Sequence, residues 1–278
     1  MDDLLVATVN GLFLVQDGLV WQLAEGDHYG LTWDRQRLYA AYRKGARIRS
    51  WDGQGEWQIV ECPHRQNDVH QILWWDGVLY VAHSGADQID AWDGAEWQTL
   101  WQGTGDGREH VNSIWYGFDR FWVVEHRFGR EPARVRMYDA GFGLVKTHEF
   151  YDLAHDHNCG LHNVYLEDGR LYTLSVDRMI IRDLIDGVEG TWKLGGYLRG
   201  LARTENHWYV GQSRISERDH RAKGDAEVLV LDGRFHVLTG ISIRDAGQIH
   251  DIRALKGDRA HNGLDCPLEM EDFWTPRE

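Results

Sequence analysis

The chain has 278 residues, a net charge of −14 and three cysteines, Cys62, Cys159 and Cys266. This length suits one large domain, and we predict a single domain over residues 1–278 without a disulfide framework. The negative charge argues against nucleic-acid binding, which draws its affinity from basic side chains meeting phosphates. No apolar run approaches the roughly 18 residues of a membrane helix, and the acidic start lacks a signal peptide's basic region. We expect a cytoplasmic protein with no nucleic-acid or membrane partner.

The predicted elements are short strands separated by turns such as Asp-Gly, which tolerates the positive φ angles of tight hairpins. In chain order, the strand signals fall at residues 4–8, 12–16, 19–23, 38–41, 50–60, 72–100, 120–124, 137–139, 170–174, 207–211 and 249–255. The stretch 72–100 contains four apolar-alternating runs in a row, so it predicts one four-stranded meander. The same unit recurs along the chain at a period of roughly 40 residues, which is typical of propeller blades.

The last unit is split between the two ends of the chain. Residues 249–255 supply its first strand, and residues 4–8, 12–16 and 19–23 supply the other three. A split unit closes a ring without a covalent link. The sequence therefore predicts an all-β, six-bladed β-propeller with four-stranded blades, and the alternatives are a β-sandwich or a β-solenoid.

Histidines recur near the start of the first strand of each unit. Counting back from the downstream turn reaches one position per unit: His28, His70, His110, His162, Arg199 and His250. Random placement of histidine would produce five of six with odds on the order of one in ten thousand. Taken alone, a histidine at a strand start is more often a hydrogen-bonded structural residue than a ligand.

Equivalent positions on six blades converge on the propeller axis, so these residues are expected to form a ring at the channel mouth. Neutral imidazole is a common metal ligand, and a set without carboxylates disfavours Ca²⁺ and Mg²⁺. We predict a transition metal, Fe(II) first and Cu, Zn, Mn or Ni otherwise. The expected ligands are a subset of His28, His70, His110, His162 and His250.

A second set of polar residues ends the second strand of each unit. Its members are Thr8, Tyr42, His83, Glu125, Ser175 and Gln212. Metal-bound histidines usually donate to a carboxylate or carbonyl, so Glu125 is predicted to support the ring. The candidate catalytic residues are Glu125, His83, Gln212 and Arg199. The alternative is that polar residues simply end strands.

Arg199 cannot ligate a metal, so it is expected to face something negative. The candidates are an anionic group of the substrate or a carboxylate such as Glu125 or Asp251; a plug of the channel is the third possibility. A basic loop, with Arg214, Arg218 and Arg221, could hold the same anion or be a solvated surface loop. His155 and His157 could add a ligand from a connecting loop or be solvated.

The blades resemble six-bladed propellers of the NHL and gluconolactonase type. Gluconolactonase-type enzymes hold their ion with Glu, Asn and Asp, where this chain has histidine. The ring is similar to that of carotenoid cleavage oxygenases, propellers whose Fe(II) is held by four blade-borne histidines supported by glutamates. This resemblance implies that the ring histidines are ligands and that Glu125 supports them.

These features predict a metal-dependent enzyme, first a non-haem Fe(II) oxidoreductase or oxygenase acting on a small, anionic substrate. A zinc- or other metal-dependent lyase or hydrolase is the second possibility, because a bound metal can also act as a Lewis acid. The third is a non-catalytic propeller that binds a protein or peptide on its top face.

Overall fold

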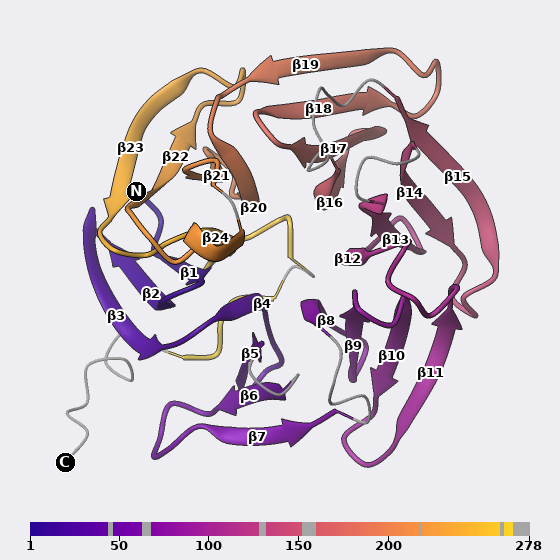
Figure 1. Ribbon diagram of the computed structural model, residues 1–278, viewed down its shortest axis with the longest axis horizontal. Coiled ribbons are helices and arrows are strands. Elements are labelled where there is room, and N and C mark those ends of the chain that lie inside the picture. The colour runs from indigo at the N-terminus through magenta and orange to yellow at the C-terminus, as the bar shows by residue number, and fades with distance from the viewer. Residues whose placement is uncertain are drawn as a thin grey trace.

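The computed structural model describes residues 1–43, 47–62, 68–127, 132–151, 160–216, 218–261 and 264–268. Its strands form six four-stranded antiparallel sheets arranged around a central axis (Figure 1). The predicted six-bladed β-propeller is confirmed. The part of the chain that is described contains no helix long and apolar enough to cross a membrane.

Each blade is a meander whose first strand lies innermost. The first blade contains β4 (His28–Trp33), β5 (Leu38–Tyr42), β6 (Arg47–Trp51) and β7 (Gln58–Glu61). The second contains β8 (Val69–Trp75), β9 (Val78–His83), β10 (Gln88–Trp92) and β11 (Trp97–Gln102). The third contains β12 (Val111–Gly117), β13 (Arg120–Glu125), β14 (Ala133–Tyr138) and β15 (Leu144–Phe150).

The remaining blades follow the same order. The fourth contains β16 (His162–Glu167), β17 (Arg170–Ser175), β18 (Arg178–Asp183) and β19 (Glu189–Lys193). The fifth contains β20 (Tyr197–Arg203), β21 (Trp208–Ser213), β22 (Ala226–Leu231) and β23 (Val237–Ile243). The sixth joins β24 (Ile249–Ala254) to β1 (Leu4–Thr8), β2 (Gly11–Gln16) and β3 (Leu19–Glu25). The pairing of β24 with β1 confirms the predicted closure by the N-terminal strands.

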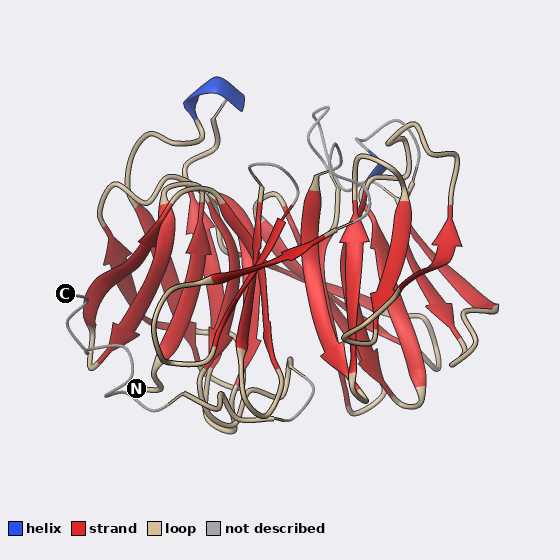
Figure 2. Ribbon diagram, turned by 90° about the horizontal axis from the view of Figure 1, so that it is seen from below, coloured by secondary structure: helices blue, strands red, loops and turns tan. Residues whose placement is uncertain are grey.

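The hydrophobic core lies between successive blades, because each sheet buries both faces against its neighbours. The inner strand β4 is buried along its whole length, whereas the outer strand β7 is mostly exposed. Figure 2 shows the short 3₁₀ helix η2 (Arg218–His220) standing above one face of the disc. The helix η2 follows β21 in the chain, and the end of β21 pairs with the start of the inner strand β20. The helix therefore stands on the face where the inner strands begin.

A polar belt joins the innermost strands around the axis. At the third position of β8, the Gln71 side chain accepts a hydrogen bond from the backbone N–H of Ile114 on the next blade, at 3.1 Å. Three further side chains accept from the following blade in the same way, each at 2.9 Å: Ser113, Asn163 and Asp251. The belt thus satisfies buried N–H groups at the inner edges of four of the six sheets.

Glycine occupies the belt positions where the blades approach too closely for a side chain. A Cβ atom at Gly30 would lie 2.6 Å from the backbone nitrogen of Ile72, and one at Gly200 would lie 2.8 Å from Cγ1 of Ile252. Polar and glycine residues at this level are therefore explained by ring closure.

The belt predicts a specific stability effect. Ser113→Ala leaves the buried N–H of Asn163 without its acceptor, so we expect the free energy of unfolding to fall by about 1–3 kcal/mol. The matched control is Ser50→Ala, because the equally buried Ser50 hydroxyl has no hydrogen-bond partner among the described residues. Urea unfolding of both variants checks this, and equal midpoints would contradict a role for the belt in ring closure.

Candidate functional site at the channel mouth

A narrow cavity of about 20 Å³ occupies the axis where the inner strands begin. Two layers of residues line it. The outer layer is Tyr29, His70, Asn112, His162, Arg199 and His250, and the inner layer is the polar belt. Room for about one water molecule at this depth means that only a small group of a ligand could enter.

His28 does not belong to this ring, which corrects the sequence alignment. It pairs with Tyr42 across the sheet, and its ring contacts the carbonyl of Gly26 and the guanidinium of Arg49. Tyr29 faces the channel instead. The alignment slipped by one residue because the first blade turns through the four residues 34–37, whereas the second blade uses the two-residue turn Asp76–Gly77.

His110 is also displaced from the ring position, which Asn112 occupies. The turn of this blade consists of Phe118 and Asp119, both at positive φ. The count of seven residues should therefore start from Asp119, which reaches Asn112, and a count from Gly117 ends two residues too early. His110 nevertheless lies at the mouth, because its ring contacts that of His70 edge-on at a centroid distance of 4.9 Å. His70, His162 and His250 do line the cavity as aligned.

His126, which the alignment did not identify, extends the cluster. Its ring centroid lies 5.4 Å from that of His110 and 4.8 Å from that of His162. On the other side, Tyr29 separates His70 from His250, at centroid distances of 4.6 and 3.8 Å. Five histidines thus surround the mouth in a run of ring contacts that Tyr29 interrupts.

His250, which lines the cavity, has one ring nitrogen without a hydrogen-bond partner in the described part of the chain. Its Nδ1 lies 2.9 Å from the backbone carbonyl of His28 and 3.5 Å from Oδ1 of Asp27. A carbonyl oxygen can only accept, so Nδ1 carries the proton and Nε2 keeps its lone pair. Nε2 is buried and has no hydrogen-bond partner among the described residues.

Arg199 supplies a buried positive charge to the same cavity. The residue is 5% exposed, and its Nη2 donates to the Tyr197 hydroxyl at 3.0 Å. Its Nε is buried without a hydrogen-bond partner, and no carboxylate pairs with Arg199 within the described ranges. Asp251, one of the two partners expected from the sequence, forms an ion pair with Arg253 at 3.2 Å and accepts a hydrogen bond from the backbone N–H of Leu31.

Four of the mouth histidines are neutral at physiological pH: His70, His126, His162 and His250. Burial, reinforced by the charge of Arg199, holds the pKa values of His162 and His250 well below the ordinary value. Burial and the same arginine lower the pKa of His126 to about 3. These neutral imidazoles lie beside the buried positive charge of Arg199.

These lowered pKa values predict acid instability. Burial also lowers the pKa of His28 to about 4, so the unfolded chain binds more protons than the folded one below pH 6.5. At pH 5, His28 and His126 each cost about 2 kcal/mol. The opposite sign applies to Asp27, Asp87, Glu125 and Asp258, where burial raises the pKa to about 6 and each returns about 1.4 kcal/mol.

Five further buried histidines also have lowered pKa values: His70, His148, His162, His250 and His261. The histidines therefore outnumber the carboxyls, and we expect the free energy of unfolding to fall by a few kcal/mol between pH 7.5 and pH 5. Urea unfolding at the two pH values measures it. Equal or higher stability at pH 5 would mean that the mouth histidines are protonated in the folded state.

The second polar set faces away from the channel. Glu125 and His83 pair with Val111 and Val69, the residues that precede the ring positions, so their side chains lie on the opposite face of the strand. Glu125 forms a buried ion pair with Arg136 at 2.9 Å, and among the described residues no ring histidine is hydrogen-bonded to it. No contact therefore supports the prediction that Glu125 stabilises the ring histidines.

His83 and Gln212 have local partners as well. His83 Nε2 lies 3.0 Å from Asp90 inside the second blade. Burial would raise the pKa of Asp90, but its hydrogen bond and charge interaction with His83 hold it below the usual value. Gln212 donates to the backbone carbonyls of Leu194 and Gly195 at 2.9 and 3.1 Å. These contacts stabilise the fold.

The sequence also indicated candidate residues in two loops, and only those of the basic loop lie partly within the described residues. His155 and His157 lie outside the described residues, as does the side chain of Arg218. In the basic loop, Arg214 is exposed, whereas Arg221 is half-buried and lowers the pKa values of His126 and His250 through its charge. Arg221 therefore adds positive potential above the mouth.

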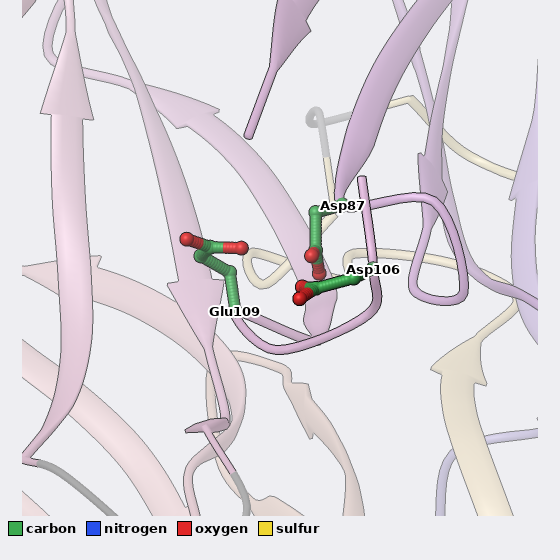
Figure 3. Close-up of side chains that lie close together, drawn as sticks. All are labelled: Asp87, Asp106 and Glu109. Atoms are coloured by element: carbon green, nitrogen blue, oxygen red, sulfur yellow. The ribbon is translucent and has the colours of Figure 1, made fainter. Parts of the chain in front are cut away.

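A group of three acidic residues lies beside this site. Carboxylate oxygens of Asp87, Asp106 and Glu109 come within 4.8 Å of one another, the one such group of His, Cys, Asp or Glu side chains among the described residues (Figure 3). Burial and a hydrogen bond with Glu109 raise the pKa of Asp87 to about 6. Asp87 also accepts the backbone N–H of His110 at 2.7 Å, so the group orders the loop that carries His110.

Four residues of the site were missed from sequence: Tyr29, Asn112, His126 and Tyr197. Alignment on the paired strands would have found Tyr29 and Asn112, since both occupy the ring register. His126 and Tyr197 lie just outside that register, and the histidine pattern carried no signal for them.

The chain matched no protein-family model and no curated protein. Among solved structures, a chain of the nidogen/laminin complex aligns with a TM-score of 0.68 at 13% identity, over 92% of this chain and 99% of that one. Virginiamycin B lyase from Staphylococcus aureus aligns with a TM-score of 0.52 at 12% identity, over 80% and 93%. Luciferin-regenerating enzyme aligns at 0.58 and 13%, over 81% and 78%. These likenesses show the fold, which enzymes and the nidogen/laminin complex share.

Proposed function

We propose that the protein is an enzyme that moves a proton on a small carboxylic acid at the channel mouth, a lyase or isomerase. The observation that carries this is that two residues lining one cavity, His250 and Arg199, each have a buried nitrogen without a hydrogen-bond partner among the residues described: Nε2 of His250 and Nε of Arg199. Arg199 binds the carboxylate, and His250 is the general base.

The site's chemistry favours an oxo acid as the substrate. A proton on a carbon beside a carbonyl is acidic enough for an imidazole base. Burial and the charge of Arg199 lower the pKa of His250, and a carboxylate bound to Arg199 would offset the part that is due to this charge. In the step, the C–H proton passes to Nε2 of His250, and the electron pair delocalises into the adjacent carbonyl as an enolate. The hydrogen bond from Nδ1 to the His28 carbonyl, with Asp27 at 3.5 Å, stabilises the imidazolium that forms.

Proton exchange tests this function without knowledge of the product. We would incubate the protein with a panel of small 2-oxo and 3-oxo acids in D₂O and follow the C–H signals by NMR. The proposal expects at least one acid to lose its C–H signal faster than in buffer. If every acid exchanges at the buffer rate, the proposed function is wrong.

A transition metal bound by the mouth histidines is the second candidate, with Fe(II) first as the sequence suggests. The gathering of five imidazoles and the bare nitrogen of His250 favours it. Against it, both nitrogens of His162 are hydrogen-bonded, and no three histidine nitrogens lie within 4.8 Å of one another in the described residues. A bound metal would act as a Lewis acid or a redox centre, and elemental analysis of untagged protein tests for it.

The solved neighbours bear on the remaining choices. Virginiamycin B lyase has a catalytically inactive variant with a histidine changed to alanine, solved with quinupristin, so a propeller of this shape can depend on one histidine. The nidogen/laminin and mitotic checkpoint structures are protein complexes, which fits a binding propeller instead. We also propose the cytoplasm as the location, because Cys62 is a buried free thiol.

A further inference from the structure

The side chain of Asn112 has only one possible orientation. Its Nδ2 lies 2.9 Å from the backbone carbonyl of Leu161, and a carbonyl can only accept, so this atom is the NH₂ group. The same NH₂ lies 3.0 Å from Nδ1 of His162 and must donate to it. His162 is neutral, so its own proton is on Nε2.

This proton reaches Tyr197. His162 Nε2 lies 3.2 Å from the Tyr197 hydroxyl and donates to it, and Arg199 Nη2 donates to the same oxygen at 3.0 Å. A phenol oxygen accepts two hydrogen bonds, so both lone pairs are used. The hydroxyl proton must therefore point elsewhere, and the described residues provide no acceptor for it.

Besides the Tyr197 hydroxyl, Arg199 supplies a second donor without an acceptor among the described residues. Its Nε is buried without a hydrogen-bond partner, while Nη2 is occupied by Tyr197. Tyr197 is itself 4% exposed, so water in bulk does not solvate its hydroxyl. The relay from Asn112 through His162 to Tyr197 thus leaves two donors, one neutral and one charged, joined through a shared hydrogen bond.

We infer that the Tyr197 hydroxyl and the Arg199 guanidinium together bind the two oxygens of a monocarboxylate, and that Tyr197 makes the site select a carboxylate over an amide. The inference rests on the proposed function, whose anion site it completes. One negative charge balances the one arginine. An amide has only one oxygen, so its NH₂ group would face either the Tyr197 hydroxyl or the Arg199 guanidinium. Two donors would then face each other without an acceptor.

Acetate, with acetamide as its uncharged isostere, tests the inference. The melting temperature is followed as acetate replaces chloride at constant ionic strength, which gives an apparent affinity. Tyr197→Phe removes the donor and should weaken acetate binding about tenfold, the usual scale for a hydrogen bond to a charged group. Tyr138→Phe, which removes a buried hydroxyl from the third blade, is the matched control and should bind as the wild type does.

The outcomes separate the inference from the proposed function. Acetate binding that is lost in Arg199→Lys but unchanged in Tyr197→Phe overturns the role of Tyr197 alone. No acetate binding by the wild type, or binding that survives in Arg199→Lys, overturns the anion site and with it the proposed function. Acetamide binding as tightly as acetate overturns the selectivity.

A measurement on the unmutated protein covers the case in which Tyr197→Phe fails to fold. Imidazole nitrogen chemical shifts distinguish which ring nitrogen of His162 carries the proton. Protonation at Nε2 is expected from the contacts with Asn112. Protonation at Nδ1 would direct the Tyr197 proton toward His162 and overturn the inference.

Discussion

In His250→Gln, exchange of the substrate's C–H proton is expected to fall 10²- to 10⁴-fold, the usual contribution of a general base. The reason is the bare Nε2, which the hydrogen bond from Nδ1 to the His28 carbonyl keeps as the acceptor. Glutamine preserves the length and polarity of the side chain but cannot take the proton. Acetate affinity should stay within about twofold, because Arg199 is untouched.

The control for this variant is His261→Gln. His261 is equally buried, and its Nε2 contacts the Thr32 hydroxyl at 3.3 Å, outside the cavity lining. Exchange should continue at the wild-type rate if the variant folds. Equal losses in both variants would show that His250 acts only by maintaining the fold.

Arg199→Lys is expected to raise KM for the carboxylic acid 10- to 100-fold with a smaller change in kcat. A lysine keeps the charge but loses the planar fork and the bond to Tyr197. The effect should appear in KM because the carboxylate is held equally before and during proton transfer. Steady-state kinetics with the acid found by exchange measures both constants.

A matched variant is Arg43→Lys, since Arg43 is a neighbouring arginine already paired with Asp27 and Asp68 at 3.4 and 3.1 Å. Its KM should change less than threefold. If the two variants raise KM equally, the effect comes from charge near the mouth and not from a specific anchor at Arg199.

The fold was predictable because its signals are local and repeated. Asp-Gly turns and alternating runs set each blade, and the split unit at residues 4–23 and 249–255 set the closure. The ring was predictable only where the turns agree. His70 and His162 follow from Asp-Gly turns, whereas His28 and His110 were assigned wrongly because the turns at 34–37 and 118–119 have other lengths or positions.

The chemistry of the site could not be predicted, because it depends on contacts between blades. That Nε2 of His250 is the bare nitrogen follows from a carbonyl at His28, 222 positions away in the chain. That Glu125 faces Arg136 follows from strand alternation, which a search for polar residues at strand ends does not consider.

A crystal structure grown with acetate and analysed by anomalous scattering tests the central claim most directly. The account predicts a carboxylate at the channel mouth within hydrogen-bond distance of Arg199 and Tyr197, with Nε2 of His250 facing its methyl group. A transition metal bound by the mouth histidines, or a guanidinium turned onto Asp27 with no acetate beside it, would contradict the account.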